Sequence, residues 1–183
     1  GQGLTDNGFF SVGFTLEGQL IHGRQRFDRW NFHERKGWQA RTSAVAEVRS
    51  VAFKSMLRYW FRTFARGVLP PQNVKALEAN LFGAISPQRF GWVTFNLHDG
   101  RVLQPEARLS GQGREDPCGE QSGTLTYSYS PEPPSEQHEV IQTLFSNLTW
   151  MMFHLGGVGQ GARRPSYSRK TRERAPWWRG STL

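Results

Sequence analysis

The most regular pattern in the chain is an alternation of apolar and polar residues from Phe10 to Ile21. Side chains two residues apart lie on the same side of a strand, so this segment predicts a β-strand with one buried face. A second strand is predicted over Trp92–Leu97, with a turn at Asp99-Gly100, and a third over Thr124–Ser130.

Other segments repeat apolar residues every three to four positions, which is typical of helices with one buried face. The first helix is expected to begin at Ser50 as its N-cap and to end near Gly67. A short helix is expected over Asn73–Phe82 and a longer one over His138–Leu155. The expected buried stripes are Phe53, Met56, Leu57, Trp60 and Phe64 in the first helix and Val140, Ile141, Leu144, Phe145, Leu148, Met151, Met152 and Leu155 in the last.

Three further segments have no helical or strand period. Residues 22–39 are polar, basic and aromatic and predict a long basic loop. Residues 110–123 are rich in turn-forming residues and predict an insertion loop, or a place where residues are missing. Residues 156–168 predict a glycine-rich loop.

The resulting order of strand, basic loop, helix, strand, strand, helix and glycine-rich loop fits a βαββαβ unit with long loop insertions. The expected fold class is therefore α+β, in the form of a ferredoxin-like (RRM-like) domain, and such sheets often bind RNA. A length of 183 residues is typical of one domain. The chain begins with Gly1 rather than Met, which leaves open that it is a fragment of a longer chain.

Charge gives the first indication of a partner. Lys and Arg number 23 against 15 Asp and Glu, for a net charge of +8, and 19 of the 23 cations are arginine, whose planar guanidinium grips phosphate and stacks on bases. Residues 1–68 and 160–183 each carry an excess of six positive charges, whereas 69–159 are net negative. This segregation favours a protein that binds nucleic acid over one whose surface is merely basic.

Other protein classes are excluded by composition. Cys118 is the only cysteine, which rules out an intrachain disulfide and a cysteine-cluster zinc site. The sequence contains no run of about 18 apolar residues and no charged-then-apolar leader. We therefore expect a soluble, cytoplasmic protein with no membrane partner.

Four cations, Lys54, Arg58, Arg62 and Arg66, recur at every fourth position of the first predicted helix. Like charges at this spacing repel by a few tenths of a kcal/mol per pair. This cation row therefore lowers the stability of the helix unless an anion lies beside it, and the alternative is a solvated helix face.

The glycine-rich loop carries the clearest chemical signal. Glycines allow the backbone N–H groups to approach a phosphate closely, while neighbouring arginines supply charge. The loop follows a helix rather than a strand and contains no lysine of the phosphate-binding kind, so it matches neither the dinucleotide fingerprint nor the P-loop. Its glycines and arginines are Gly156, Gly157, Gly159, Gly161, Arg163 and Arg164.

Three segments, taken in order, resemble the RAMP superfamily, the repeat-associated proteins of type III CRISPR effector complexes. Residues 47–58 (EVRSVAFKSMLR) are similar to the family's entry into its first helix, and residues 78–83 (EANLFG) to the segment E-x-x-L/I-F-G. Residues 154–164 (HLGGVGQGARR) are similar to the family's glycine-rich loop. Within that superfamily the chain resembles the subunit class that caps the type III-B backbone, and a RAMP domain of a fused type III-D chain is the alternative.

The resemblance implies a backbone subunit that binds guide RNA (crRNA), contributes to target RNA binding in antiviral defence, and has other effector subunits as partners. It implies contact with RNA phosphates rather than bases, which agrees with the arginine bias. The RNA-binding residues implied by the matching motifs are Lys54, Arg58, Gly157, Gly159, Arg163 and Arg164, and charge and position add Arg24, Arg26, Arg62, Arg66, Tyr167 and Arg169.

An endoribonuclease is the alternative function. Some RAMP subunits cut target RNA with an aspartate after the first strand, and Asp28, between Arg26 and Arg29, is the one candidate in that segment. A histidine in the same segment, His22 or His33, is the candidate general base for cutting repeat RNA. We expect no metal site or other cofactor, with a divalent metal left open for a catalytic Asp28.

Overall fold

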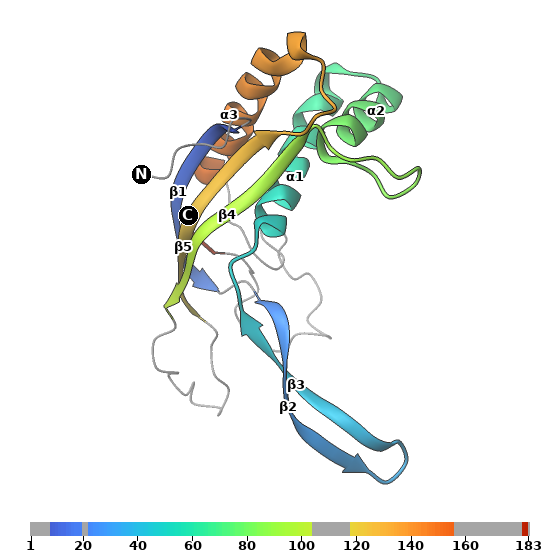
Figure 1. Cartoon of the computed structure of the whole chain (residues 1–183), viewed down its shortest axis with the longest axis vertical. Coiled ribbons are helices and arrows are strands. Elements are labelled where there is room, and N and C mark those ends of the chain that lie inside the picture. Colours follow the sequence, from blue (N-terminus) through green and yellow to red (C-terminus); the bar gives the residue numbers. More distant parts are fainter. Residues whose placement is uncertain (1–7, 20–21, 104–117, 156–180, 183) are drawn as a thin grey trace.

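The computed structural model describes residues 8–19, 22–103, 118–155 and 181–182 of the chain. They form a four-stranded antiparallel sheet in the order β4-β5-β1-β6, three helices on one face of this sheet, and a separate hairpin (Figure 1). The elements are β1 (Gly8–Gln19), β2 (His22–His33), β3 (Gly37–Ala46), α1 (Ser50–Val68), α2 (Pro71–Phe82), β4 (Val93–Leu103), β5 (Cys118–Tyr129), a 3-10 turn (Ser135–Gln137), α3 (His138–Leu155) and β6 (Ser181–Thr182).

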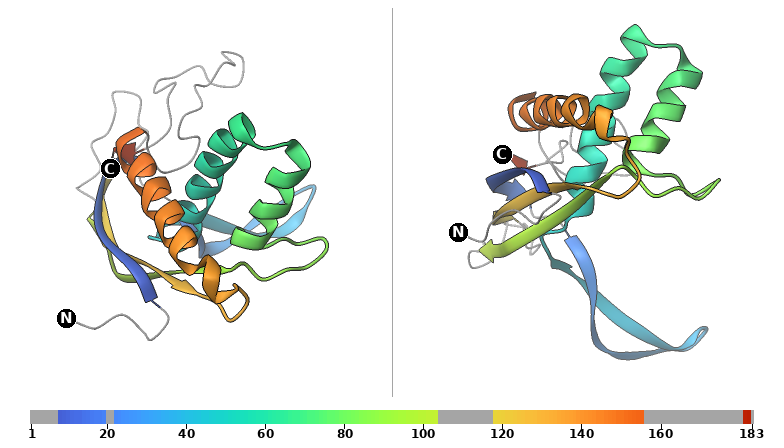
Figure 2. Two further views of the ribbon diagram at one scale, coloured as in Figure 1. Left: turned by 90° about the horizontal axis from the view of Figure 1, so that it is seen from above. Right: turned by 45° about the horizontal axis from the view of Figure 1, so that its top comes forward.

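The hydrophobic core lies between the sheet and the helices (Figure 2). Alternation along β1 turns Phe14 and Leu16 toward the helices, and both are buried. The ring of Phe14 lies 4.6 Å from that of Phe53 on α1, measured between centroids. Burial of each such side chain stabilises the fold by about 1.5–3 kcal/mol.

One polar group in the core is satisfied by a short chain of hydrogen bonds. Tyr127 of β5 is fully buried, and its hydroxyl lies 2.8 Å from the hydroxyl of Thr149 on α3. Thr149 donates its own hydrogen to the carbonyl oxygen of Phe145 at 2.7 Å, so the Tyr127 hydroxyl is the donor to Thr149. This pairing fixes α3 over the centre of the sheet.

The expected helices are present, with changes at their ends and faces. The bounds of α3 agree with the sequence, and α1 begins at Ser50, with Arg49 rather than Ser50 as its N-cap. Phe64 was expected in the core but is 51% exposed, and Phe61 and Ala65 are buried in its place. The ring of Phe61 packs against Phe82 of α2, with centroids 5.9 Å apart.

The fold class is α+β with antiparallel sheets, and it is compatible with a ferredoxin-like domain. β1 and β5 occupy the centre of the sheet, and α1 and α3 follow them in the chain. The β2–β3 hairpin and α2 are additional to the six elements of a βαββαβ unit. None of the described helices is both long and apolar enough to cross a membrane.

The prediction of a loop over residues 22–39 was wrong in its secondary structure. β2 and β3 form an antiparallel hairpin closed by a turn after His33, and it projects away from the sheet and helices (Figure 1). Side chains on both of its faces are exposed, so no alternation of apolar and polar residues marks the strands. A strand with no buried face carries no such sequence pattern.

Two further expectations about β4 and β5 are corrected. Asp99-Gly100 does not end β4 in a turn. It forms a bulge, with the register shifted between His98 and Arg101 and Asp99 at φ 53°, and the strand continues to Leu103. Residues 118–123 of the expected insertion belong to β5, while 110–117 lie outside the described residues.

The connection from α2 to β4 is held by two glycines packed backbone to backbone. Gly83 has φ +85°, and a Cβ added there would lie 2.8 Å from the carbonyl oxygen of Arg89. A Cβ at Gly91 would lie 2.7 Å from the carbonyl carbon of Phe82 and 2.8 Å from the carbonyl oxygen of Leu81. No side chain can be added at either position without moving the backbone.

We expect Gly91→Ala to lower the free energy of unfolding by about 2–3 kcal/mol, since the added methyl must displace the end of α2. Gly67→Ala is the matched control, because Gly67 lies in α1 with open space around its Cβ position. That control should raise stability by about 0.5–1 kcal/mol. Urea unfolding of both variants measures the difference, and equal effects would contradict the close packing.

Candidate nucleic-acid interface

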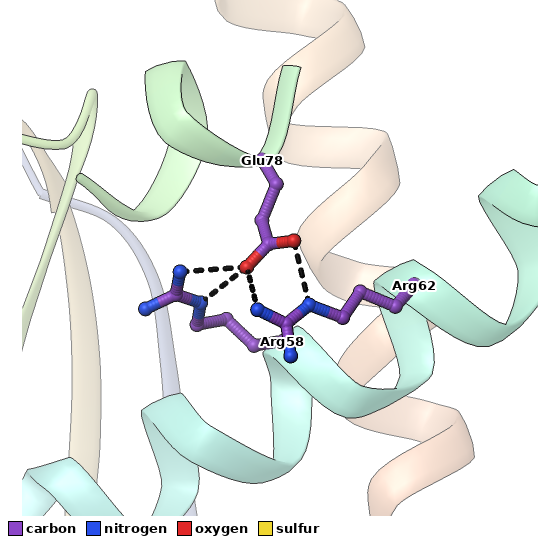
Figure 3. Close-up of polar contacts among 3 residues, drawn as sticks. All are labelled: Arg58, Arg62 and Glu78. Carbon is purple, nitrogen blue, oxygen red and sulfur yellow. Dashed lines mark hydrogen bonds and ion pairs between the residues drawn. The ribbon is translucent and has the colours of Figure 1, made fainter. Parts of the chain in front are cut away.

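The cation row on α1 meets a carboxylate from the neighbouring helix. Glu78 of α2 lies between Arg58 and Arg62 and accepts hydrogen bonds from both (Figure 3). Nε of Arg58 lies 2.8 Å from Oε1, and Nε and Nη2 of Arg62 lie 2.6 Å and 2.5 Å from Oε2 and Oε1. The anion that the row requires is therefore supplied by the protein itself.

The charges in this cluster stabilise one another. Glu78 is only 6% exposed, and burial alone would raise its pKa, but the hydrogen bonds from Arg62 and Arg58 outweigh burial and hold the pKa of this carboxyl below its ordinary value. The hydrogen bond to Glu78 likewise raises the pKa of Arg62. Two guanidiniums against one carboxylate leave the cluster with a net positive charge, and the side chains of Arg58 and Arg62 remain 34% and 48% exposed.

The two ends of the cation row differ from its centre. Lys54 is partly buried, with its Nζ 5.6 Å from the centroid of the Phe95 ring on β4. Burial, and to a lesser degree the charge of Arg58, lowers the pKa of Lys54. Arg66, in the last turn of α1, is exposed. Of the four predicted cations, Arg62 and Arg66 are thus the more accessible to a ligand.

The β2–β3 hairpin is a second basic surface. Residues 22–46 carry six Lys and Arg against two Asp and Glu. Arg29 and Arg41 are direct cross-strand partners, both exposed, and neither forms an ion pair among the described residues. Like charges directly opposite one another in a hairpin are destabilising. An external anion between the two guanidiniums would remove this repulsion.

Exposed aromatic rings accompany these arginines. Phe27 and Trp30 form one pair, with centroids 5.6 Å apart, and Phe32 and Trp38 form another at 5.4 Å. All four rings are between 51% and 66% exposed. By strand alternation, Trp30 and Phe32 lie on the face opposite Arg29. The hairpin therefore has an arginine face and an aromatic face.

Of the other predicted hairpin residues, Arg24 lies on β2 opposite Val45, and Arg26 lies opposite Ser43. Asp28 occupies the bulge between Phe27 and Arg29. Its Oδ1 accepts a hydrogen bond from the Ser43 hydroxyl at 2.9 Å and lies 3.9 Å from Nε of Arg26. The aspartate thus has local partners within the hairpin.

The histidine candidates are not brought together. His22 is the first residue of β2 and His33 the last. Within the described ranges, no three His, Cys, Asp or Glu side chains gather as a metal site would require. The remaining predicted RNA-binding residues, Gly157, Gly159, Arg163, Arg164, Tyr167 and Arg169, lie outside the described residues.

The open face of the four-stranded sheet differs from an aromatic RNA platform. The aromatic residues Phe14, Phe95 and Tyr127 point to the helix side, where they contact other core rings. By strand register, the opposite face carries small polar side chains, which are Ser11, Thr15, Thr94, Asn96, Ser122, Thr124, Thr126 and Ser128, and with them the ionisable residues Glu17, His98, Arg101 and Glu120. Among the described strands, the exposed Phe and Trp rings on which bases could stack therefore lie on the hairpin and not on this face.

Sequence reasoning missed two parts of this interface. The sequence marks Glu78 only as part of the segment EANLFG, although its carboxylate supplies the anion that the cation row requires. The aromatic residues of the hairpin fall within the segment 22–39 that the sequence predicts as a loop. Their signal was the combination of Trp, Phe and Arg in HGRQRFDRWNFHERKGW, which is unusually aromatic for a loop.

We expect Glu78→Gln to lower the free energy of unfolding by about 2 kcal/mol, a value reduced for the partial exposure of both arginines. The amide removes the negative charge and leaves Arg58 and Arg62 to repel one another. Arg66→Ala on the same helix is the control and should change stability by no more than about 0.5 kcal/mol. Equal stabilities of the Glu78 variant and wild type in urea would contradict the ion pairs.

The same carboxylate predicts a dependence on pH. A carboxyl group whose pKa is lowered by folding stabilises the protein above its ordinary pKa, and that contribution is lost as pH falls through the folded-state pKa. Wild type should therefore lose stability as pH falls below the ordinary value of 4.5, and Glu78→Gln should lose less. Chemical unfolding at neutral and acidic pH, with Glu132→Gln as an exposed control, measures this difference. Parallel curves for all three proteins would count against it.

No protein-family model matches the sequence. The chain is similar to the CRISPR system Cmr subunit Cmr1-1 of Pyrococcus furiosus, with 28% identity over 153 residues, covering 70% of this chain. The match covers 42% of the relative, so the chain spans less than half of that protein's length. This distant similarity supports the resemblance of the chain to the RAMP-like proteins of type III CRISPR systems.

Proposed function

We propose that the chain is a guide-RNA-binding subunit of a type III CRISPR effector complex and contributes to the binding of target RNA. The similarity to a Cmr subunit supports membership in such an assembly, with other effector subunits as partners. The observation that carries the RNA-binding part is the exposed cross-strand pair of Arg29 and Arg41 on a hairpin with four exposed aromatic rings.

The two faces of the hairpin suit two parts of an RNA strand. Guanidiniums on the arginine face would contact phosphate oxygens, and the Arg29–Arg41 repulsion would be relieved by the bound anion. Rings on the aromatic face would stack on unpaired bases, which is favourable whatever the base is. Neither contact reads sequence, as a subunit that accepts any guide requires.

The cation row would provide a second contact with the RNA backbone. Glu78 fixes the directions of the Arg58 and Arg62 side chains before RNA binds, so less side-chain entropy is lost on binding. Lys54 and Arg66 extend the row toward β4 and toward the end of α1. We also propose that the loop residues Gly157, Gly159, Arg163, Arg164, Tyr167 and Arg169 bind the RNA, and that the domain is a ferredoxin-like RAMP domain.

We propose that the chain itself binds RNA without cutting it. Asp28 is the bulged residue of β2, and its carboxylate is held by Ser43 and Arg26. Contacts of this kind stabilise a bulge. They give no indication that Asp28 acts as a general base. The chain would act inside a complex whose RNA cleavage takes place on another subunit.

The experiment that tests this function is purification of the chain with its native partners, followed by sequencing of the RNA that it carries. Short RNAs with one shared repeat-derived 5′ end and variable remaining sequence are expected. Heterogeneous cellular RNA, or a complex that contains no RNA, would contradict guide binding and leave the basic surface as a general polyanion site.

We expect Arg29→Ala and Arg41→Ala each to weaken RNA binding by a similar factor for unrelated guide sequences. Each should also reduce the slope of log affinity against log salt by about 1, as the loss of one phosphate contact does. Lys75→Ala, which removes an exposed cation from α2, is the matched control and should change neither quantity. Titrations of labelled RNA at several salt concentrations measure both, and unchanged slopes in the arginine variants would refute the hairpin contact.

A further inference from the structure

The β2–β3 hairpin receives little support from the rest of the domain. None of the side chains described between residues 25 and 46 is buried. The two strands pair with each other from end to end, whereas their contacts with the described sheet and helices are slight at most (Figure 1). A two-stranded hairpin without such support is only marginally stable in water, because it has no apolar face to bury. The stability of this hairpin therefore depends on contacts within itself.

Two cross-strand contacts favour the closed hairpin. Phe32 and Trp38 are direct partners, and their rings meet edge to face with centroids 5.4 Å apart. The Ser43 hydroxyl on β3 donates a hydrogen bond to the Asp28 carboxylate on β2. The rings of Phe32 and Trp38 remain 63% and 66% exposed, so closure of the hairpin removes little apolar surface from water. These contacts stabilise the hairpin less than a hydrophobic core would.

Other features oppose closure of the hairpin. Arg29 and Arg41 lie directly opposite each other and are both exposed. Like charges in this position destabilise a strand pair. The register shifts at residues 22–24 and again at 27–29, so the pairing of the strands is interrupted twice. The unfavourable Arg29–Arg41 contact is also the one that a bound phosphate would make favourable.

The cations of α1 are held differently. Glu78 bonds to Arg58 and Arg62, and the helix that carries both arginines packs on the core. That part of the proposed interface is therefore ordered in the absence of RNA. Hairpin closure is the step at which folding and RNA binding can be coupled, because closure brings Arg29 and Arg41 together and a bound phosphate removes the repulsion between them.

We propose that the hairpin opens in the free chain while the sheet and helices stay folded, and that RNA binding closes it. A ligand that binds only the closed form draws the equilibrium toward that form, and its measured affinity is the intrinsic affinity reduced by the closed fraction. The stability of the hairpin then regulates how tightly the chain binds RNA. This inference rests on the RNA binding proposed above and adds the conformational step that controls it.

Hydrogen exchange of the full chain, alone and with a single-stranded RNA of mixed sequence, tests the opening. In the free chain, the amides of β2 and β3 should exchange about a hundredfold faster than those of α3 and β5, and RNA should slow them. Equal protection of the hairpin and α3 in the free chain would overturn the proposal, as would bound RNA that left hairpin exchange unchanged. Absence of RNA binding, measured separately by titration, would overturn the closure step together with the proposed function.

A cross-link across the hairpin tests whether closure limits affinity. Asn31 and Gln39 are exposed cross-strand partners, and partners of this kind have Cα atoms close enough for a disulfide. In a Cys118→Ser background, Asn31→Cys with Gln39→Cys should bind the same RNA about threefold more tightly when oxidised than when reduced. Cys118→Ser alone under both conditions is the control. Equal or weaker binding by the oxidised form would count decisively against the proposal.

Gly37→Ala destabilises the closed form at its turn. Gly37 has φ +67°, which a residue with a Cβ adopts at a cost, and it has no side chain that RNA could contact. We expect the variant to bind the same RNA roughly fivefold less tightly and its hairpin amides to exchange faster. Gly13→Ala in β1, where nothing lies within 4 Å of an added Cβ, is the matched control and should change neither quantity. Unchanged RNA affinity of Gly37→Ala would refute the coupling.

Discussion

The placement of the Glu78 carboxylate between Arg58 and Arg62 determines how the cations of α1 can coexist on one helix face. α1 needs its apolar face for the core, so its cations share the remaining surface at a spacing at which they repel. Glu78 removes that repulsion for Arg58 and Arg62 and joins α2 to α1. The cost of burying the carboxylate is offset by four short contacts, and the helix keeps an exposed net positive charge.

The hairpin has no comparable internal anion at its centre. Arg29 and Arg41 face each other across β2 and β3, while the single ion pair described in the hairpin, Arg26 with Asp28, lies at the bulge. Like-charge repulsion is thus relieved within the chain on α1 and not on the hairpin. On α1 the protein satisfies the cations and orients them, whereas on the hairpin no described carboxylate lies between Arg29 and Arg41. The hairpin is therefore a better surface than α1 on which to test the proposed RNA binding.

Sequence patterns predicted the parts of the fold that are buried on one face. The bounds of α3 and the core residues Ile141, Phe145 and Leu148 followed from helical spacing. The hairpin was missed because neither of its faces is buried, so it leaves no alternation to detect. The need for an anion beside Arg58 and Arg62 could be predicted, but its source could not, because Glu78 lies 20 and 16 residues away on another helix. The role of the glycine-rich loop stays a prediction.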